Sequence, residues 1–236
     1  MTAEELQTES ALADKVKEFL TQYKDSTGSF SYVEQIDQMM PKHAKYIVVD
    51  FNDLVSVPLI ESKFVESPDE ILHAFSRAIK EILQERFPEY ARKIEHEIRA
   101  RIANFPAERS LRQINSEVIT KMISVSGMVV RASEVKPLAK EVTYKCLDKH
   151  ISVFTLLDGM SLNTSVKCQT PNCKHTNLAI IPEDSRFIDF QIVRLQELPE
   201  DLPPGQLPHY VNISMKQDLV DYARPGDRIV LTGIVR

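Results

Sequence analysis

Residues 1–105 carry apolar side chains at the spacing of amphipathic helices. A stripe that repeats about every 3.6 residues between positions 4 and 24 predicts one helix. A second helix is expected to begin at Pro68, because proline suits the first helical turn and the acidic pair after it favours the positive end of a helix. After a break at Pro88, a further stripe predicts another helix up to Asn104, formed by Tyr90, Ile94, Ile98 and Ile102. The β-rich segment at residues 46–51 predicts a short strand.

At Pro106 the period of the pattern changes to two, which is the period of side chains along a β-strand. Strands are expected at residues 122–135, 141–146, 177–181, 188–195, 211–215 and 228–235. Gly127 lies inside the first of them, where a glycine suits a bulge that helps a small barrel to close. Short strands of this kind predict a five-stranded barrel of the oligonucleotide/oligosaccharide-binding (OB) type.

All three cysteines of the chain lie in one window that interrupts the predicted barrel. Cys146 and His150 form one closely spaced pair, and Cys168 and Cys173 form another. Three thiolates and one imidazole at such spacing are typical of a structural, tetrahedral zinc site, with a hairpin that brings the two pairs together. The expected fold class is therefore α+β: an N-terminal helical bundle, then an OB-fold β-barrel with an inserted zinc-binding hairpin.

His175 is a rival for the fourth position of this zinc site, although it lies closer to Cys173 than the usual spacing allows. Four protein ligands leave no position for a catalytic water, so the predicted zinc is structural and a zinc-dependent enzyme is disfavoured. The sequence contains no glycine-rich phosphate loop with its lysine, so no ATPase activity is expected of this chain.

Charge and composition restrict the partners. The chain has 236 residues and a net charge of −5, and residues 1–105 hold 13 basic and 19 acidic residues. The remaining residues hold 16 basic and 15 acidic ones, so a nucleic-acid site is expected in this second part, as a local patch. No signal sequence is found at the N-terminus, and no segment approaches the roughly 20 apolar residues that span a bilayer, so we expect an intracellular protein without membrane contact.

Four segments around the zinc-type insertion form a specific combination, at residues 123–137, 190–197, 202–208 and 218–234. In this order they resemble the N-terminal domain of the archaeal minichromosome maintenance (MCM) replicative helicases. The resemblance implies a helical bundle at residues 1–105, an OB fold at residues 106–141 and 179–236, and a zinc-binding insertion at residues 142–178. It also implies hexameric rings that encircle DNA, with ring-to-ring contact through the zinc hairpins. The proline-rich loop at residues 197–208 resembles the loop that communicates with the motor domain of the family.

The resemblance places DNA contacts on a strip of basic residues across the OB fold. The matching positions are Arg131, Lys136 and Arg194, and the fourth position, usually an arginine, is His209. A histidine is mostly neutral near pH 7, which weakens a phosphate contact and makes it sensitive to pH. Phe187 and Phe190 have rings suited to base stacking, but aromatic residues in strands more often pack in a core.

The sequence departs from the family pattern in three ways. Many members use four cysteine ligands, whereas this chain has His150. The chain stops at Arg236, before the basic hairpin of the family, and it lacks the AAA+ motor that uses ATP and Mg²⁺.

We therefore interpret the chain as the DNA-binding and ring-assembly module of a hexameric, ATP-dependent replicative DNA helicase, without enzymatic activity of its own. Its expected partners are single- and double-stranded DNA, further copies of itself in a hexamer or double hexamer, and other replication factors, in the cytoplasm or nucleoid. The alternative is a stand-alone OB-fold protein that contains zinc and binds single-stranded DNA.

Overall fold

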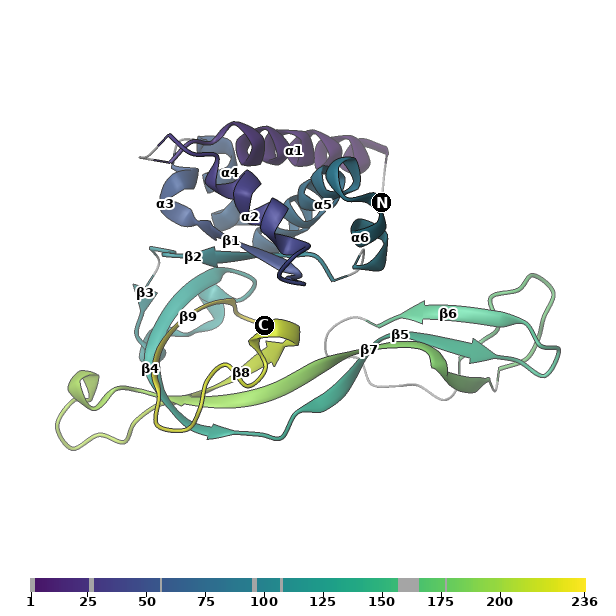
Figure 1. Ribbon diagram of the computed structural model, residues 1–236. Coiled ribbons are helices and arrows are strands. Elements are labelled where there is room, and N and C mark those ends of the chain that lie inside the picture. The colour runs from purple at the N-terminus through teal and green to yellow at the C-terminus, as the bar shows by residue number, and fades with distance from the viewer. Residues whose placement is uncertain are drawn as a thin grey trace. The chain divides into compact units, whose positions relative to one another are not determined.

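The computed structural model describes residues 3–25, 28–55, 57–94, 97–106, 108–156, 166–176 and 178–236 (Figure 1). Helices form the first part of the chain and a mostly antiparallel sheet forms the second, which confirms the expected α+β class. The chain divides into two compact units. The first comprises residues 1–127, 197–209 and 229–236, and the second comprises residues 128–196 and 210–228.

Six helices are described in the first unit, and they share one apolar core. They are α1 (Ala3–Gln22), α2 (Ser31–Met39), α3 (Phe51–Leu54), α4 (Pro58–Glu66), α5 (Pro68–Arg86) and α6 (Pro88–Lys93). α5 buries Ile71, Phe75 and Ile79 in this core, and α1 packs along it. α4, α5 and α6 each begin with a proline, whose fixed φ suits the first helical turn. The start of α5 at Pro68 confirms the prediction from the sequence.

The helix predicted up to Asn104 is wrong beyond Lys93. α6 ends there, and residues Arg99–Ala103 form strand β2, which pairs in parallel with β1 (Tyr46–Asp50). Ile98 and Ile102 are four residues apart, and four is also a multiple of the two-residue period of a strand. In the strand, Arg99 and Arg101 alternate with apolar residues. Pairing with β1 therefore decides between two structures that the pattern allows.

The strands of the second part form one sheet around β7, the longest strand. Its order is β3 (Glu108–Arg109), β4 (Met122–Ala132), β7 (Ala179–Gln196), β5 (Lys136–Lys145) and β6 (Ile151–Thr155), with β8 (Tyr210–Lys216) paired to β7 and β9 (Arg228–Ile234) paired to β4. The strands predicted at 177–181 and 188–195 are both parts of β7, except that residue 177 lies outside the described residues. The other four predicted strands are confirmed.

The register shift that the structure describes between β4 and β7 lies close to Gly127, where the sequence predicts a bulge, but not at it. The register between β4 and β7 shifts between Val129 and Arg131. Gly127 is not in the left-handed region of backbone conformation, so its φ does not itself require a glycine.

A second irregularity separates two parts of the β5–β7 ladder. Residues 182–185 of β7 lie opposite the single residue Val142 of β5, and we call them the 182–185 bulge. The Ser185 hydroxyl accepts a hydrogen bond from the N–H of Thr143 at 3.0 Å and donates one to the carbonyl of Ile181 at 2.6 Å. The bulge is therefore a closed, hydrogen-bonded structure.

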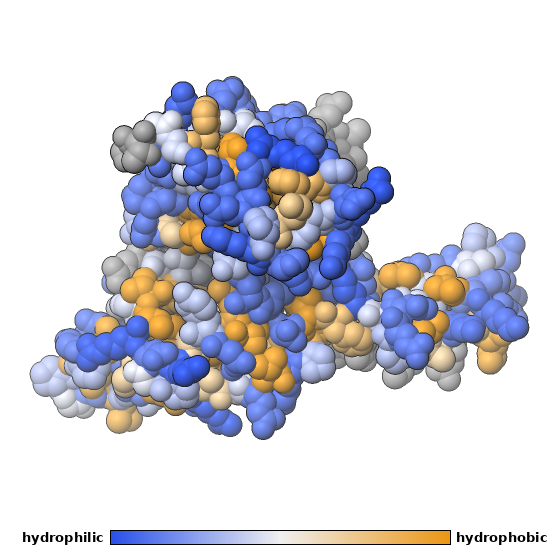
Figure 2. Space-filling view, in the orientation of Figure 1, coloured by the Kyte–Doolittle hydropathy of each residue, from blue (hydrophilic) through white to orange (hydrophobic). Residues whose placement is uncertain are grey.

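Beyond the 182–185 bulge, β5, β6 and the first residues of β7 continue as an arm of the second unit (Figure 1). The buried apolar side chains of this arm are few among the described residues: Val142, Tyr144, Cys146 and Leu178. Tyr144 meets the ring of Phe154 edge-on, with 5.4 Å between ring centroids. The surface of the arm shows hydrophobic patches among hydrophilic residues (Figure 2), and its exposed apolar side chains include Leu147, Ile151 and Val153.

Arg112 holds together the two ends of the proline-rich loop at residues 197–208, all within the first unit. Its Nε donates to Glu197 Oε1 at 2.7 Å, and its Nη2 donates to the carbonyl of Leu207 at 3.1 Å. A further Nη1 hydrogen bond reaches the side chain of Gln206. The Glu197 side chain is only 2% exposed, and Arg112 lowers its pKa by hydrogen bonding. We call this arrangement the Arg112 clamp.

Replacing Arg112 by alanine is expected to lower the midpoint of thermal unfolding at pH 7 and to speed proteolytic cleavage within residues 198–207, because a buried carboxylate loses its cation. The pKa of Glu197 is lowered in the folded state, so the clamp stabilises the protein above the ordinary carboxyl pKa, and this contribution is lost as the pH falls through the lowered value. The difference in midpoint between wild type and variant should therefore shrink in acid. Scanning calorimetry and limited proteolysis measure both effects, with Arg92→Ala on α6 as the matched control. Equal midpoints at pH 7 would show that the clamp contributes nothing.

Candidate metal centre and candidate nucleic-acid interface

Cys146 and His150 are brought together by the turn between β5 and β6. The N–H of Lys149 donates to the carbonyl of Cys146 at 3.0 Å, and the N–H of Cys146 donates to the carbonyl of His150 at 3.0 Å. Lys149 has a φ of 65°, in the left-handed region, which reverses the chain within a few residues. The turn therefore places a thiol and an imidazole side by side at the end of the arm.

Cys168 and Cys173 are presented by a second turn. The N–H of Cys173 donates to the carbonyl of Thr170 at 3.2 Å, and Asn172 within this turn has a φ of 67°. The N–H of Cys168 donates to the carbonyl of His175 at 3.0 Å, which closes the base of the loop. Ser152 of β6 joins this loop to the arm, because its hydroxyl accepts from the N–H of Gln169 at 3.2 Å.

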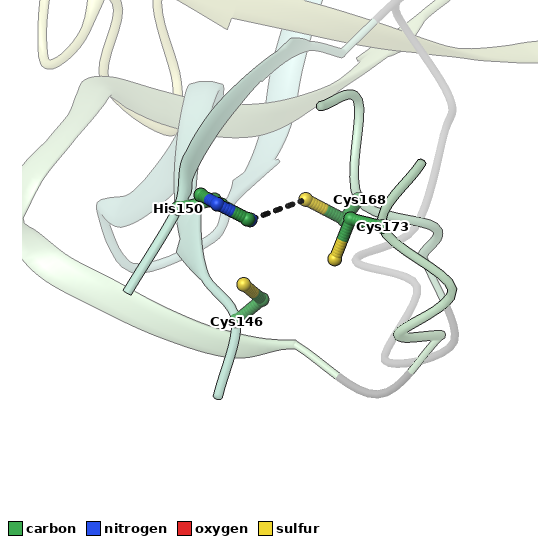
Figure 3. A group of neighbouring side chains, drawn as sticks. All are labelled: Cys146, His150, Cys168 and Cys173. Atoms are coloured by element: carbon green, nitrogen blue, oxygen red, sulfur yellow. Dashed lines mark hydrogen bonds between the residues drawn. The ribbon is translucent and has the colours of Figure 1, made fainter. Parts of the chain in front are cut away.

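The two turns face each other, and the four side chains point toward a common centre (Figure 3). The three sulfurs and one imidazole nitrogen all lie within 4.8 Å of one another, and Cys168 Sγ lies 3.9 Å from His150 Nδ1. In a tetrahedral zinc site with bonds of about 2.0–2.3 Å, neighbouring ligand atoms are roughly 3.3–3.8 Å apart. The four residues therefore fit a zinc ion in both donor type and spacing, after a small contraction.

Hydrogen bonds stabilise one thiolate of this group. The side chain and the backbone N–H of Thr170, with a smaller contribution from Ser152, lower the pKa of Cys168 to about 6. The N–H of His175 favours the thiolate of Cys173, but partial burial and the neighbouring sulfurs outweigh that bond and raise the pKa of Cys173. Thiolates that crowd together in this way are stabilised by a shared dication, which requires deprotonated ligands.

His175, the rival ligand, lies in a different group. Its Nε2 is 3.1 Å from Asp148 Oδ2, and with Asp148 and Cys173 it forms a second set of close ligand atoms. Among the described side chains, the group of three cysteines and one histidine contains His150 instead. The structure thus favours the ligand set Cys146, His150, Cys168 and Cys173.

Three of the four basic candidates lie on one exposed face of the second unit. Arg131 of β4 and Arg194 of β7 are direct cross-strand partners, and Lys136 of β5 is the partner of Phe190 on β7. Along β7, Gln191, Val193 and Leu195 are buried on one face of the sheet. Phe190 and Arg194 lie at the alternate positions of the strand, so they share the opposite face. We call Arg131, Lys136 and Arg194 the basic strip.

No carboxylate pairs with the basic strip in the part of the chain that the structure describes. Other arginines do have such partners, including Arg86 with Asp37 at 2.6 Å and Arg186 with Glu141 at 2.9 Å. Like charges directly across two strands destabilise a sheet, so the Arg131–Arg194 pair has a cost. Its exposed guanidinium groups remain available to an anion.

His209 lies one residue before β8, and its backbone is tied to Glu197. Its N–H donates to Glu197 Oε2 at 3.3 Å, and its carbonyl accepts from the N–H of Glu197 at 3.1 Å. Of the two phenylalanines considered from the sequence, Phe187 is exposed and Phe190 is half-buried.

Tyr210 was not identified from the sequence, although it contacts the basic strip. The guanidinium carbon of Arg194 lies 4.5 Å from the centroid of the Tyr210 ring. The signal in the sequence is the alternation from Tyr210 to Ser214, which puts Tyr210 and Asn212 on the side opposite Val211 and Ile213.

Fold and sites together define a protein with a helical domain, an OB-type sheet, a group of four potential metal ligands on an arm and a basic face. Residues 13–104 match the family model of the MCM N-terminal domain, and residues 110–236 match that of the MCM OB domain. The chain belongs to the minichromosome maintenance (MCM) family.

Relatives of the chain occur in archaea and eukaryotes. It is 32% identical over 223 residues to the minichromosome maintenance protein MCM of Saccharolobus solfataricus. The matched region covers 92% of this chain and 32% of that relative. It is 38% identical over 169 residues to the DNA replication licensing factor MCM4 of Drosophila melanogaster. This matched region covers 72% of the chain and 19% of the relative. The chain thus spans between about a fifth and a third of these relatives.

The helices that the structure describes include none that is long and apolar enough to cross a membrane.

Proposed function

We propose that this chain is the DNA-binding and ring-assembly module of a replicative DNA helicase. The observation that carries the proposal is the exposed Arg131–Arg194 pair, without a carboxylate partner among the described residues, on the OB-type sheet of an MCM-family chain. The names of the relatives, which include DNA replication licensing factors, support a role in DNA replication. Lys136 and His209 complete the proposed phosphate contacts.

The proposed zinc has a structural role. Cys146, His150, Cys168 and Cys173 would hold it, and four protein ligands leave no open position for a substrate or water. Zinc at such a site supplies free energy of folding to the arm. ATP and Mg²⁺ are used, in this proposal, by a motor domain of the helicase that this sequence does not include.

The proposal divides the chain into a helical bundle at residues 1–105, an OB fold at residues 106–141 and 179–236, and a zinc-binding insertion at residues 142–178. The chain assembles into a hexameric ring around DNA, intracellularly and with other replication factors. Exposed apolar side chains on the arm, such as Ile151 and Val153, support ring-to-ring contact through the arms of a double hexamer.

Fluorescence anisotropy with a labelled single-stranded oligonucleotide tests the proposal directly. Affinity should fall as the salt concentration rises, because phosphate contacts release counterions. Light scattering of the same samples separates the proposal from its alternative: ring formation on DNA supports the helicase module, and a 1:1 complex supports a stand-alone single-strand binder. Failure to bind DNA at low salt would overturn both.

Purified chain is expected to show no ATP turnover, because its sequence lacks the loop of backbone N–H groups and lysine that holds nucleotide phosphates. A coupled phosphate-release assay at several stages of purification measures this. Turnover that stays proportional to the amount of chain through successive columns would contradict the assignment of ATP chemistry to a separate motor.

A further inference from the structure

Tyr210 joins the exposed face on which the basic strip lies. It is the first residue of β8 and pairs with Gln196 of β7, two residues along the strand from Arg194. Tyr210 is 47% exposed, and the guanidinium carbon of Arg194 lies 4.5 Å from its ring centroid. Diagonal neighbours on one face of a sheet are within reach of each other when the side chains are long or aromatic.

The rows of this face have a fixed order. Lys136, Phe190 and Lys216 form one row, Ile192 and Ser214 the next, then Arg131, Arg194 and Asn212, and finally Gln196 and Tyr210. Successive residues on one face are about 6.8 Å apart along a strand, so the face extends roughly 20 Å from the first row to the last. Cations and aromatic rings therefore occur together at both ends of one track, with Lys136 beside Phe190 at one end and Arg194 beside Tyr210 at the other.

A single strand of nucleic acid offers a matching combination of charge and flat apolar surface, in its phosphates and bases. Aromatic side chains in OB folds stack on bases while neighbouring cations track the backbone. An exposed ring that already carries a guanidinium against it is held in place before the ligand arrives, so little ordering entropy is lost on binding.

We propose that Tyr210 is a base-stacking residue of the DNA interface, with Arg131 and Arg194 beside it on the phosphates. This inference rests on the proposed function, because it needs a single strand on the basic strip. It adds to that function a preference for strands that carry bases over the bare sugar–phosphate backbone. Stacking has no counterion term, so the contribution of Tyr210 does not depend on salt.

The test compares an oligonucleotide of thymidines with an abasic oligonucleotide of equal length and charge. Wild type should bind the first about tenfold more tightly, a factor within the range of one base–aromatic stack. Tyr210→Ala should lose about tenfold in affinity for the thymidine strand, keep its affinity for the abasic strand and keep the salt slope. Tyr210→Phe should bind like wild type, since the ring is retained. Tyr222→Ala is the matched control, because Tyr222 is an 80% exposed tyrosine of the same unit.

Each outcome separates this inference from the proposed function. If wild type binds neither strand, the proposed function fails and the inference with it. If wild type binds both strands equally, DNA binding stands and stacking by Tyr210 is overturned, a result that needs no variant. If Tyr210→Ala weakens both strands alike and flattens the salt slope, Tyr210 only positions Arg194 and the inference is overturned.

Discussion

Cys168→Ser is expected to release the zinc and to unfold the arm while the helices stay folded. Among the described residues, the buried apolar core of the arm consists of four side chains, one of which is the candidate ligand Cys146, so apolar burial alone gives this structure little stability. Structural zinc in small peptides contributes about 10–16 kcal/mol of apparent binding free energy at pH 7, and at such sites this is also free energy of folding. Elemental analysis should find one zinc per wild-type chain and a substoichiometric amount in the variant. Hydrogen exchange should show lost protection in β5 and β6.

His175→Ala is the control for this result. His175 pairs with Asp148, outside the group of four ligands, so the variant should keep its zinc and the protection of the arm. Removal of zinc from wild type by a chelator should reproduce the exchange pattern of Cys168→Ser. If His175→Ala loses the metal and His150→Ala keeps it, the ligand set is wrong, and a wild type grown with zinc that holds no tightly bound metal would refute the site.

Replacing Arg131 and Arg194 together by alanine is expected to weaken binding to single-stranded DNA by about tenfold or more, because two charge-assisted contacts to phosphate are lost. For single strands, each contacted phosphate contributes about 0.7 to the slope of log affinity against log salt, so the slope should flatten by about 1.4. Arg131 and Arg194 face each other across β4 and β7, so removing both like charges relieves their repulsion and stability should not fall. Anisotropy across a salt series measures affinity and slope in one experiment.

Arg92→Ala/Lys93→Ala is matched to this variant in charge, since it also removes two exposed cations, from the last turn of α6. It should leave both affinity and slope close to wild type. If this helix variant loses binding and the Arg131/Arg194 variant retains it, the DNA interface lies on the helical domain and the assignment of the basic strip is wrong.

The parts of the fold that local chemistry decides could be predicted from the sequence. Proline at a first helical turn gave the start of α5, and the change of period at Pro106 gave the sheet. The segment Arg99–Ala103 could not be decided in this way, because its isoleucines fit both periods and its strand depends on β1, about 50 residues earlier in the chain. The bulge near Val130 was missed for a similar reason: its position follows from the β4–β7 register, and glycine is only one of several residues that a bulge accepts.

In the candidate sites, too, local sequence predicts some residues, and contacts between distant segments decide the others. Close spacing in sequence indicated the two ligand pairs. The turns at Lys149 and Asn172 bring the members of each pair together, and the two turns face each other, so that all four ligands meet. The preference for His150 over His175 depends on the contact with Asp148, which no spacing rule contains. Tyr210 was missed because its role is visible only once β8 is placed beside β7 and its ring lies against Arg194.

The 182–185 bulge makes the arm an exchangeable part of the protein in evolutionary terms. On one side of the bulge, Thr143–Lys145 pair with Ala179–Ile181, and on the other side the ladder resumes at Arg186 with a register of its own. In an uninterrupted strand, an insertion of one residue would turn every later side chain to the opposite face, and Arg194 would exchange places with the buried Val193. Because the bulge already interrupts the pairing, descendants of this chain can lengthen, shorten or replace the arm and its metal ligands while the basic face keeps its register.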